Sequence, residues 1–117
     1  MKRRYRLRKN ADFRRVRREG QSVSNRLLVL IVAPNKLNHS RFGFAVSKRI
    51  GKAVKRNKIK RQMREAARLC REQIQTGWDI LFIARVAVNE ASYQEIEQSA
   101  HNLLHKMRLF IEHDISV

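Results

Sequence analysis

The sequence predicts a single domain, 1–117, that contains both strands and helices, from three observations. Runs of branched and aromatic apolar residues at 26–33 and 78–85 are typical of strands. The stretches 55–71 and 92–110 repeat apolar residues at the helical period. A length of 117 residues leaves room for one modest core and for no second domain.

The first expected element is a short helix over "NADFRRVRREG", 10–20. Asn10 is a suitable N-cap, because its side chain can accept a hydrogen bond from an unpaired backbone N–H. Phe13 and Val16 fall on one face, and Gly20 is a typical helix stop.

Two strands are expected next. The first, "RLLVLIVA", ends before Pro34, and the second is "RFGFAVS", 41–47. The segment 34–40, "PNKLNHS", has the composition of a turn or short loop.

A helix rich in basic residues follows the loop 48–53, "KRIGKA", and runs from about Lys55 to Arg71. At about 100° per residue its apolar side chains fall on one stripe, which we expect to face the core. The stripe consists of Ile59, Met63, Ala66, Ala67 and Cys70.

The last third begins with a turn at 76–77, followed by the strand 78–85. A final helix is expected over 92–110, where Ser92 and Glu95 have the spacing of a capping box. Phe42, Phe44, Trp78 and Phe82 belong to strands or their starts, and we expect them in the core.

The charge of the chain is extreme and unevenly placed. The net charge is +17, and 21 of the 27 Lys and Arg residues lie in 1–19 and 48–71. Residues 72–117 carry seven acids against three bases, so we expect this part to be scaffold. Such a charge favours a polyanionic partner, and nucleic acid is the leading candidate.

The basic helix should carry a ridge of positive charge opposite its apolar stripe. Most charged helix faces are simply solvated, but those usually mix signs, and 48–71 has eleven bases and one acid, Glu65. Repulsion between side chains four residues apart should destabilise the isolated helix, which indicates a role outside the fold. The ridge consists of Asn57, Lys60, Arg61, Arg64, Arg68 and Arg71.

The sequence gives no support for catalysis or metal binding by the protein alone. Its ten acids are scattered, whereas a metal-dependent nuclease gathers carboxylates around two ions. The segment 101–105, "HNLLH", has zinc-helix spacing but Asn102 in place of the general-base Glu. Cys70, the only cysteine, is expected to be a small core residue.

We also expect a cytoplasmic protein without a membrane partner. The basic N-terminus lacks the apolar run of a secretory signal, and no apolar stretch approaches the roughly 20 residues that span a bilayer. One cysteine cannot form an internal disulfide, which fits a reducing compartment.

The segment "FGFAVSKRIGKAVKRNKIKRQMRE", 42–65, resembles the signature of the bacterial ribonuclease P protein family. The resemblance extends over almost the whole chain, through "RLRKNADFRRVRREG", "DILFIAR" and "SYQEIEQSAHNLLHK". It implies a two-layer α+β sandwich of order α-β-β-β-α-β-α, with a left-handed βαβ crossover that carries the basic helix.

The resemblance also implies a function. The protein would bind ribonuclease P RNA, and the pair would remove the 5′ leader from precursor tRNA, with the chemistry carried by Mg²⁺ that the RNA holds. No catalytic residue and no protein-bound metal or cofactor is implied. The RNA-binding residues would be Arg49, Lys52, Arg56, Asn57, Lys58, Lys60, Arg61, Arg64 and Arg68, and the leader-binding residues Phe13, Arg17, Ile31 and Lys48.

The chain departs from the family pattern at two places. The family motif commonly reads Arg-Asn-Arg, but this chain has Lys58 in the third position, which keeps the charge and loses the planar fork. Arg17 and Ile31 stand where relatives often carry aromatic residues, although a base can stack on a guanidinium plane as well as on a ring.

Two other classes of function are compatible with the charge. A ribosomal or chaperone-type RNA-binding protein would share the charge and the layers, but would not account for the loop "SKRIGKAV" joined to an Arg-Asn-Lys helix. A membrane-surface binder usually carries Trp, Phe or Leu on its apolar stripe, and this stripe has the small side chains Ala66, Ala67 and Cys70.

Overall fold

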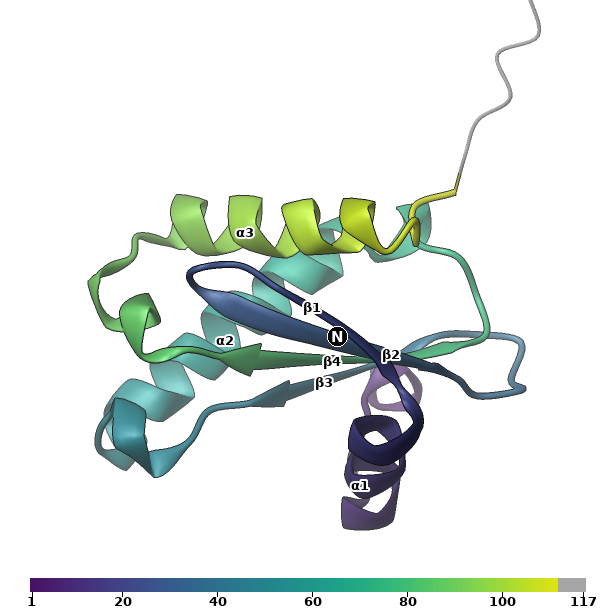
Figure 1. Ribbon diagram of the computed structural model, residues 1–117, viewed down its shortest axis with the longest axis horizontal. Coiled ribbons are helices and arrows are strands. Elements are labelled where there is room, and N and C mark those ends of the chain that lie inside the picture. Colours follow the sequence, from purple (N-terminus) through teal and green to yellow (C-terminus); the bar gives the residue numbers. More distant parts are fainter. Residues whose placement is uncertain (112–117) are drawn as a thin grey trace, which may run out of the picture.

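The computed structural model describes residues 1–111. A four-stranded sheet carries two helices on one face and a short helix on the other (Figure 1). No helix in the part of the chain described is both long and apolar enough to cross a membrane. The elements are α1 Asn10–Glu19, β1 Gln21–Ser24, β2 Leu28–Pro34, β3 Arg41–Ala45, α2 Ala53–Cys70, β4 Trp78–Ala84 and α3 Tyr93–Lys106.

The sheet has the strand order β1-β2-β4-β3. β2 pairs antiparallel with both β1 and β4, whereas β3 and β4 pair in parallel. Parallel neighbours need a crossover connection, and α2 supplies it. The α+β class, the order of elements and the βαβ unit that carries the basic helix are therefore confirmed.

The main core lies between the sheet and the layer formed by α2 and α3. Phe42, Phe82 and Leu30 are fully buried there, and Phe44 and Trp78 pack against the same cluster. All five residues of the predicted apolar stripe on α2 are buried, which confirms that prediction. Burial raises the pKa of the Cys70 thiol to about 11, so the thiol stays protonated at neutral pH.

A second, smaller core lies beneath α1 on the opposite face of the sheet. Val16 packs there against Leu81 and Ala33, with Leu7 from the N-terminal segment beside them. The contact is close because β3 carries Gly43 at this point: a Cβ there would lie 2.9 Å from a ring carbon of Phe13 and 3.1 Å from Leu7. A larger residue at this position would push α1 away from the sheet.

The N-terminal arm, which we define as residues 1–9, has no counterpart in the sequence prediction. It contains a 3₁₀ turn, Arg3–Tyr5, and then forms a parallel bridge between Arg6 and Phe42 on β3. The Leu7 N–H donates to the Phe42 carbonyl at 2.8 Å. The arm thereby covers the start of the outer edge of β3.

Several boundaries differ from prediction. Lys9, not Asn10, is the N-cap of α1, and no side chain caps that helix. α2 begins at Ala53, earlier than expected, and α3 ends at Lys106, where the helical pattern had suggested residue 110. The residue pattern did not predict the strand β1, because its sequence "QSVS" contains only one residue that favours strands.

The capping box of α3 is confirmed. The Ser92 hydroxyl accepts from the Glu95 N–H at 3.2 Å, and the Glu95 carboxylate accepts from the Ser92 N–H at 3.0 Å. These hydrogen bonds hold the pKa of Glu95 below its usual value. The helix therefore begins at a fixed residue, as the spacing predicted.

Candidate RNA-binding site

A cleft of ≈ 380 Å³ opens beside the outer edge of β3. α1 lies on one side of it and α2 on the other, and the N-terminal arm borders it. The cleft brings together residues far apart in sequence, and its lining residues include no acid. They are Arg6, Leu7, Arg8, Phe13, Phe42, Phe44, Asn57, Lys60 and Arg64.

Arg64 is the most unusual cation of this cleft. Its Nε atom is buried and has no hydrogen-bond partner among residues 1–111. Partial burial, and then repulsion from Arg6 and Arg61, lower the pKa of Arg64 from its ordinary value. A buried donor without an acceptor and a cation without a counterion both cost free energy, so the position favours an anion in the cleft.

The predicted ridge on α2 divides between two neighbouring surfaces. Asn57, Lys60 and Arg64 face the cleft, whereas Arg61 lines a shallow hollow that α2 forms with the start of α3. Lys58, which is outside the ridge, lines the same hollow. α2 therefore presents positive charge on two neighbouring surfaces, the cleft and the shallow hollow. A nucleic acid that lies across α2 could contact both groups at once.

Arg68 differs from the expectation of a free cation. Its guanidinium donates to both oxygens of the Glu65 carboxylate, at 2.6 and 2.9 Å. This pairing raises the pKa of Arg68 and lowers that of Glu65. Of the ridge residues, Arg68 therefore has the least charge to offer a partner.

The loop that leads into α2 presents three exposed cations, Lys48, Arg49 and Lys52. A 3₁₀ turn, Lys48–Ile50, anchors the loop through its one buried side chain, Ile50. Arg56 donates to the Gly51 carbonyl at 3.1 Å, so this predicted RNA-binding residue also holds the loop.

The predicted leader-binding residues lie around α1. Phe13 and Ile31 are half-buried and join the same apolar cluster on the face that α1 covers. Ile31, Leu81 and Gly43 form one row across the sheet; the next row toward the ends of β3 and β4 is half-buried and consists of Val29, Ile83 and Ala45.

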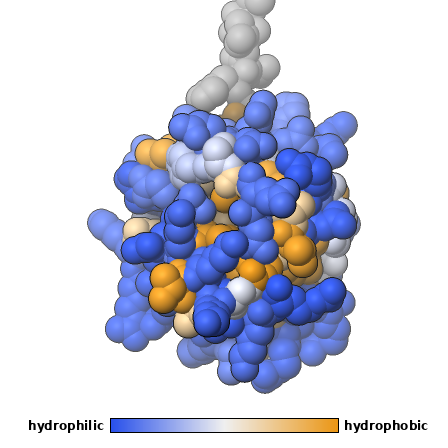
Figure 2. All heavy atoms as spheres, turned by 90° about the vertical axis from the view of Figure 1, so that its left-hand side faces the viewer, coloured by the Kyte–Doolittle hydropathy of each residue, from blue (hydrophilic) through white to orange (hydrophobic). Residues whose placement is uncertain are grey.

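Arg17 and Lys48, the other two predicted leader-binding residues, are both exposed. Arg17 is exposed and one helical turn after Phe13, so the two share a face of α1. Lys48 is exposed just beyond β3. Figure 2, which faces the end of the molecule where β3 and β4 finish, shows apolar surface in the middle of a mainly hydrophilic face.

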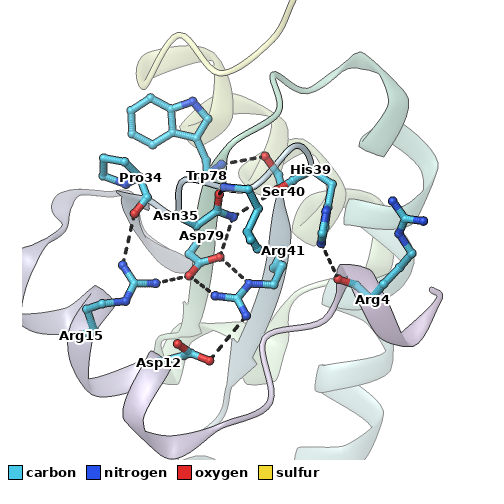
Figure 3. Close-up of polar contacts among 11 residues, drawn as sticks. Arg4, Asp12, Arg15, Pro34, Asn35, His39, Ser40, Arg41, Trp78 and Asp79 are labelled. Atoms are coloured by element: carbon cyan, nitrogen blue, oxygen red, sulfur yellow. Dashed lines mark hydrogen bonds and ion pairs between the residues drawn. The ribbon is translucent and has the colours of Figure 1, made fainter.

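A buried ionic network, which the sequence did not predict, fixes α1 on the sheet (Figure 3). Asp79 on β4 is fully buried and accepts from Arg41 at 2.9 and 2.7 Å, from Asn35 at 3.0 Å and from Arg15 of α1. The hydrogen bonds to Asp79 raise the pKa of Arg41. Asp12 of α1 pairs with the same guanidinium at 3.6 Å.

The two histidines of "HNLLH" lie in different surroundings. His105 is exposed, and His101 meets Phe110 edge to face with ring centroids 6.0 Å apart. Within the part of the chain described, no three His, Cys, Asp or Glu side chains lie close enough to hold a metal ion. The cleft thus presents cations, an amide and aromatic rings, which suit binding of a polyanion.

Comparison with known proteins agrees with this geometry. The ribonuclease P family model matches residues 1–108. The ribonuclease P protein component of Alkaliphilus oremlandii is 46% identical over 104 residues, which covers 89% of this chain and 91% of that protein. The one from Herpetosiphon aurantiacus is 47% identical and covers 94% of this chain and 89% of its own length.

Solved structures show the same fold. The ribonuclease P protein of Staphylococcus aureus superposes with a TM-score of 0.85 at 40% identity, over 92% of this chain and 98% of that one. The family match, the identities and the shared fold agree over nearly all of the chain described. The chain therefore belongs to the bacterial ribonuclease P protein family.

Proposed function

We propose that this chain is the protein subunit of ribonuclease P, the ribonucleoprotein endoribonuclease that gives tRNA its mature 5′ end. It binds the catalytic RNA through α2 and the loop before it, and holds the 5′ leader of precursor tRNA beside α1. We place this activity in the cytoplasm, the compartment that the sequence predicts.

One observation carries the proposal. The cleft beside β3 brings Asn57, Lys60 and Arg64 from the family motif together with Phe13 from α1, across more than forty residues of sequence. The cations can pair with phosphates, the amide can hydrogen-bond a ribose or base edge, and the ring can stack on an unpaired base. Single-stranded RNA offers all three groups.

In the proposed enzyme the RNA holds the Mg²⁺ ions that carry out hydrolysis. The protein contributes binding: it neutralises phosphates and positions the unpaired leader. This division suits a chain in which 27 bases outnumber ten acids. The carboxylate of Asp79 is fully buried and already paired with Arg15 and Arg41.

The proposal predicts that the protein without RNA leaves precursor tRNA uncut at millimolar Mg²⁺. Phosphodiester hydrolysis by two metal ions needs several carboxylates around the ions, and the described residues offer no such group. Gel analysis of 5′-labelled precursor would test this with nuclease-free protein, with the catalytic RNA alone and with both. Cleavage at the mature 5′ end by protein alone would contradict the proposal.

The leader assignment predicts a change in substrate preference. Replacing both Phe13 and Arg17 with Ala should weaken binding of precursor tRNA to the assembled enzyme by about tenfold, because stacking on a base contributes roughly 1–3 kcal/mol. Affinity for mature tRNA, which lacks the leader, should stay nearly unchanged. Equilibrium binding of each tRNA to the holoenzyme would measure the ratio of the affinity for precursor tRNA to the affinity for mature tRNA.

Phe13 also packs against Gly43, so this test needs a control for stability. Arg18→Ala removes the same charge as Arg17→Ala from the same helix but from a different face, and should leave the ratio unchanged. Phe13→Leu should keep most of the packing and lose the flat ring. If both affinities and the melting temperature fall together, α1 is scaffold and the leader lies elsewhere.

A further inference from the structure

A second cationic hollow lies at the other end of α2 from the family motif, where the N-terminal arm meets the start of β3. It has a volume of ≈ 170 Å³, and its lining includes Arg4, Tyr5, Asn38, His39 and Arg71 but no acid. Asn57 and Arg71 are 14 residues apart along α2 and the 3₁₀ turn that follows it, which places the hollow roughly 20 Å from Asn57.

Tyr5 organises the cations of this hollow. The Arg71 guanidinium carbon lies 3.9 Å from the centroid of the Tyr5 ring, and that of Arg4 lies 5.0 Å from it. His39 meets the same ring edge to face at 5.7 Å, and its Nε2 lies 3.1 Å from the Arg4 carbonyl oxygen. The ring thereby contacts both guanidinium groups, and the histidine contacts both the ring and the backbone of the arm.

The two guanidinium groups keep their hydrogen-bond donors free. Arg71 is half-buried and Arg4 is exposed. Three other half-buried arginines, Arg15, Arg41 and Arg56, each donate to an acceptor of the protein. Within residues 1–111, neither Arg4 nor Arg71 donates a side-chain hydrogen bond or forms an ion pair. A cation–π contact orients a guanidinium without using its N–H groups, so these donors remain available for an outside acceptor.

A purely structural role for Arg4 and Arg71 explains their contacts with Tyr5 less well. The arm is already tied to β3 by the Arg6 bridge and by the Leu7 N–H bond to Phe42. Anchoring the arm requires the ring of Tyr5 and one cation, and the second cation adds repulsion at this site. Both cations line one hollow that no acid lines with them, and such a lining matches a phosphate group.

We propose that this hollow binds a backbone phosphate of the catalytic RNA, as a contact separate from the family motif on α2. The proposal rests on the proposed function. The hollow has the volume of several water molecules, which is enough for one phosphate. Two guanidinium groups can each present a fork of N–H donors to its oxygens. We assign it to the catalytic RNA because Arg71 directly follows the helix that carries the motif.

The test is equilibrium binding of the full-length protein to the catalytic RNA at about 0.2 M salt, where screening leaves mainly local contacts. Arg4→Ala combined with Arg71→Ala should weaken binding by about tenfold and reduce the salt slope by about 0.7–0.9 for each phosphate that the variant no longer neutralises. The matched control, Arg26→Ala combined with Lys106→Ala, removes two exposed charges elsewhere and should change affinity by no more than about twofold.

Two further variants separate phosphate binding from support of the fold. Arg71→Lys keeps the charge and loses the fork, so its affinity should fall while its melting temperature stays near that of the wild type. Tyr5→Phe keeps the ring and should bind like the wild type. Three results would each overturn the proposal. The Arg4 and Arg71 variant and the control variant could lose affinity for the catalytic RNA equally, or neither could lose any. The Arg4 and Arg71 variant could also lose affinity for precursor tRNA alone.

The outcomes also separate this inference from the proposed function. If the wild-type protein fails to bind the catalytic RNA, both the proposed function and the second phosphate site are wrong. If the wild type binds and a variant of Lys60 and Arg64 does not, while the Arg4 and Arg71 variant binds normally, only the second phosphate site is wrong.

Discussion

Replacing Lys60 and Arg64 together with Ala should lower affinity for the catalytic RNA by about a hundredfold. Both side chains line the cleft beside β3, and a hydrogen bond to a charged group contributes about 1.5–3 kcal/mol. The fold should be unaffected, because Arg64 is partly buried without a counterion and is repelled by Arg6. Binding at fixed salt and thermal unfolding, measured on the same preparation, check both parts.

The structure decides which residues of the ridge belong in this experiment. Arg68 is bound to Glu65 by two hydrogen bonds, so Arg68→Ala should change affinity much less than Arg64→Ala. The Arg26 and Lys106 pair again serves as the charge-matched control. Affinity unchanged in the Lys60 and Arg64 variant would remove the cleft from the RNA interface.

The largest effect on stability is expected at Asp79. Asp79→Asn removes the negative charge that Arg41 and Arg15 share. It leaves Arg15 without a counterion and Arg41 with only the 3.6 Å pair to Asp12. Breaking a buried ion pair from one side costs about 3–5 kcal/mol, and the partial exposure of both arginines favours the lower end of that range. Urea unfolding followed by fluorescence of Trp78, the only tryptophan and the residue just before Asp79 on β4, would measure the loss.

Asp12→Asn is the matched control for this prediction. Asp12 pairs with the same Arg41 guanidinium, but at 3.6 Å and with solvent nearby, so its removal should cost less than about 1 kcal/mol. Because Arg15 and Asp79 hold α1 on the sheet, Asp79→Asn should also weaken binding of the leader. Equal stability of the two variants would show that the network adds little to the fold.

The sequence predicted best the elements whose pattern is local. The stripe of α2 is read from residues three and four apart, and Ile59 and Met63 are buried as expected. The capping box of Ser92 and Glu95 depends on a spacing of three residues. Even the resemblance to the family rests mainly on one continuous segment, 42–65.

The features that were missed depend on contacts between distant residues. β1 is a strand because its backbone pairs with β2, and its side chains contribute little to that choice. The N-terminal arm is highly basic and has no apolar period, yet it pairs with β3 through Arg6. Asp79 lies in an apolar strand, and nothing adjacent to it in the sequence indicates Arg15 or Arg41 as partners.

The sequence by itself determined that this protein is a basic domain of strands and helices with one highly charged helix, because charge and periodicity are properties of neighbouring residues. Only the tertiary structure decided which charges are free. In the folded chain Arg68 pairs with Glu65, and Arg41 pairs with Asp79. Arg64 lines a cleft that contains no acid, and Arg71 packs on the ring of Tyr5. A charge becomes available to a partner only after the folded chain has satisfied its own acids, and that pairing is set by distances in space.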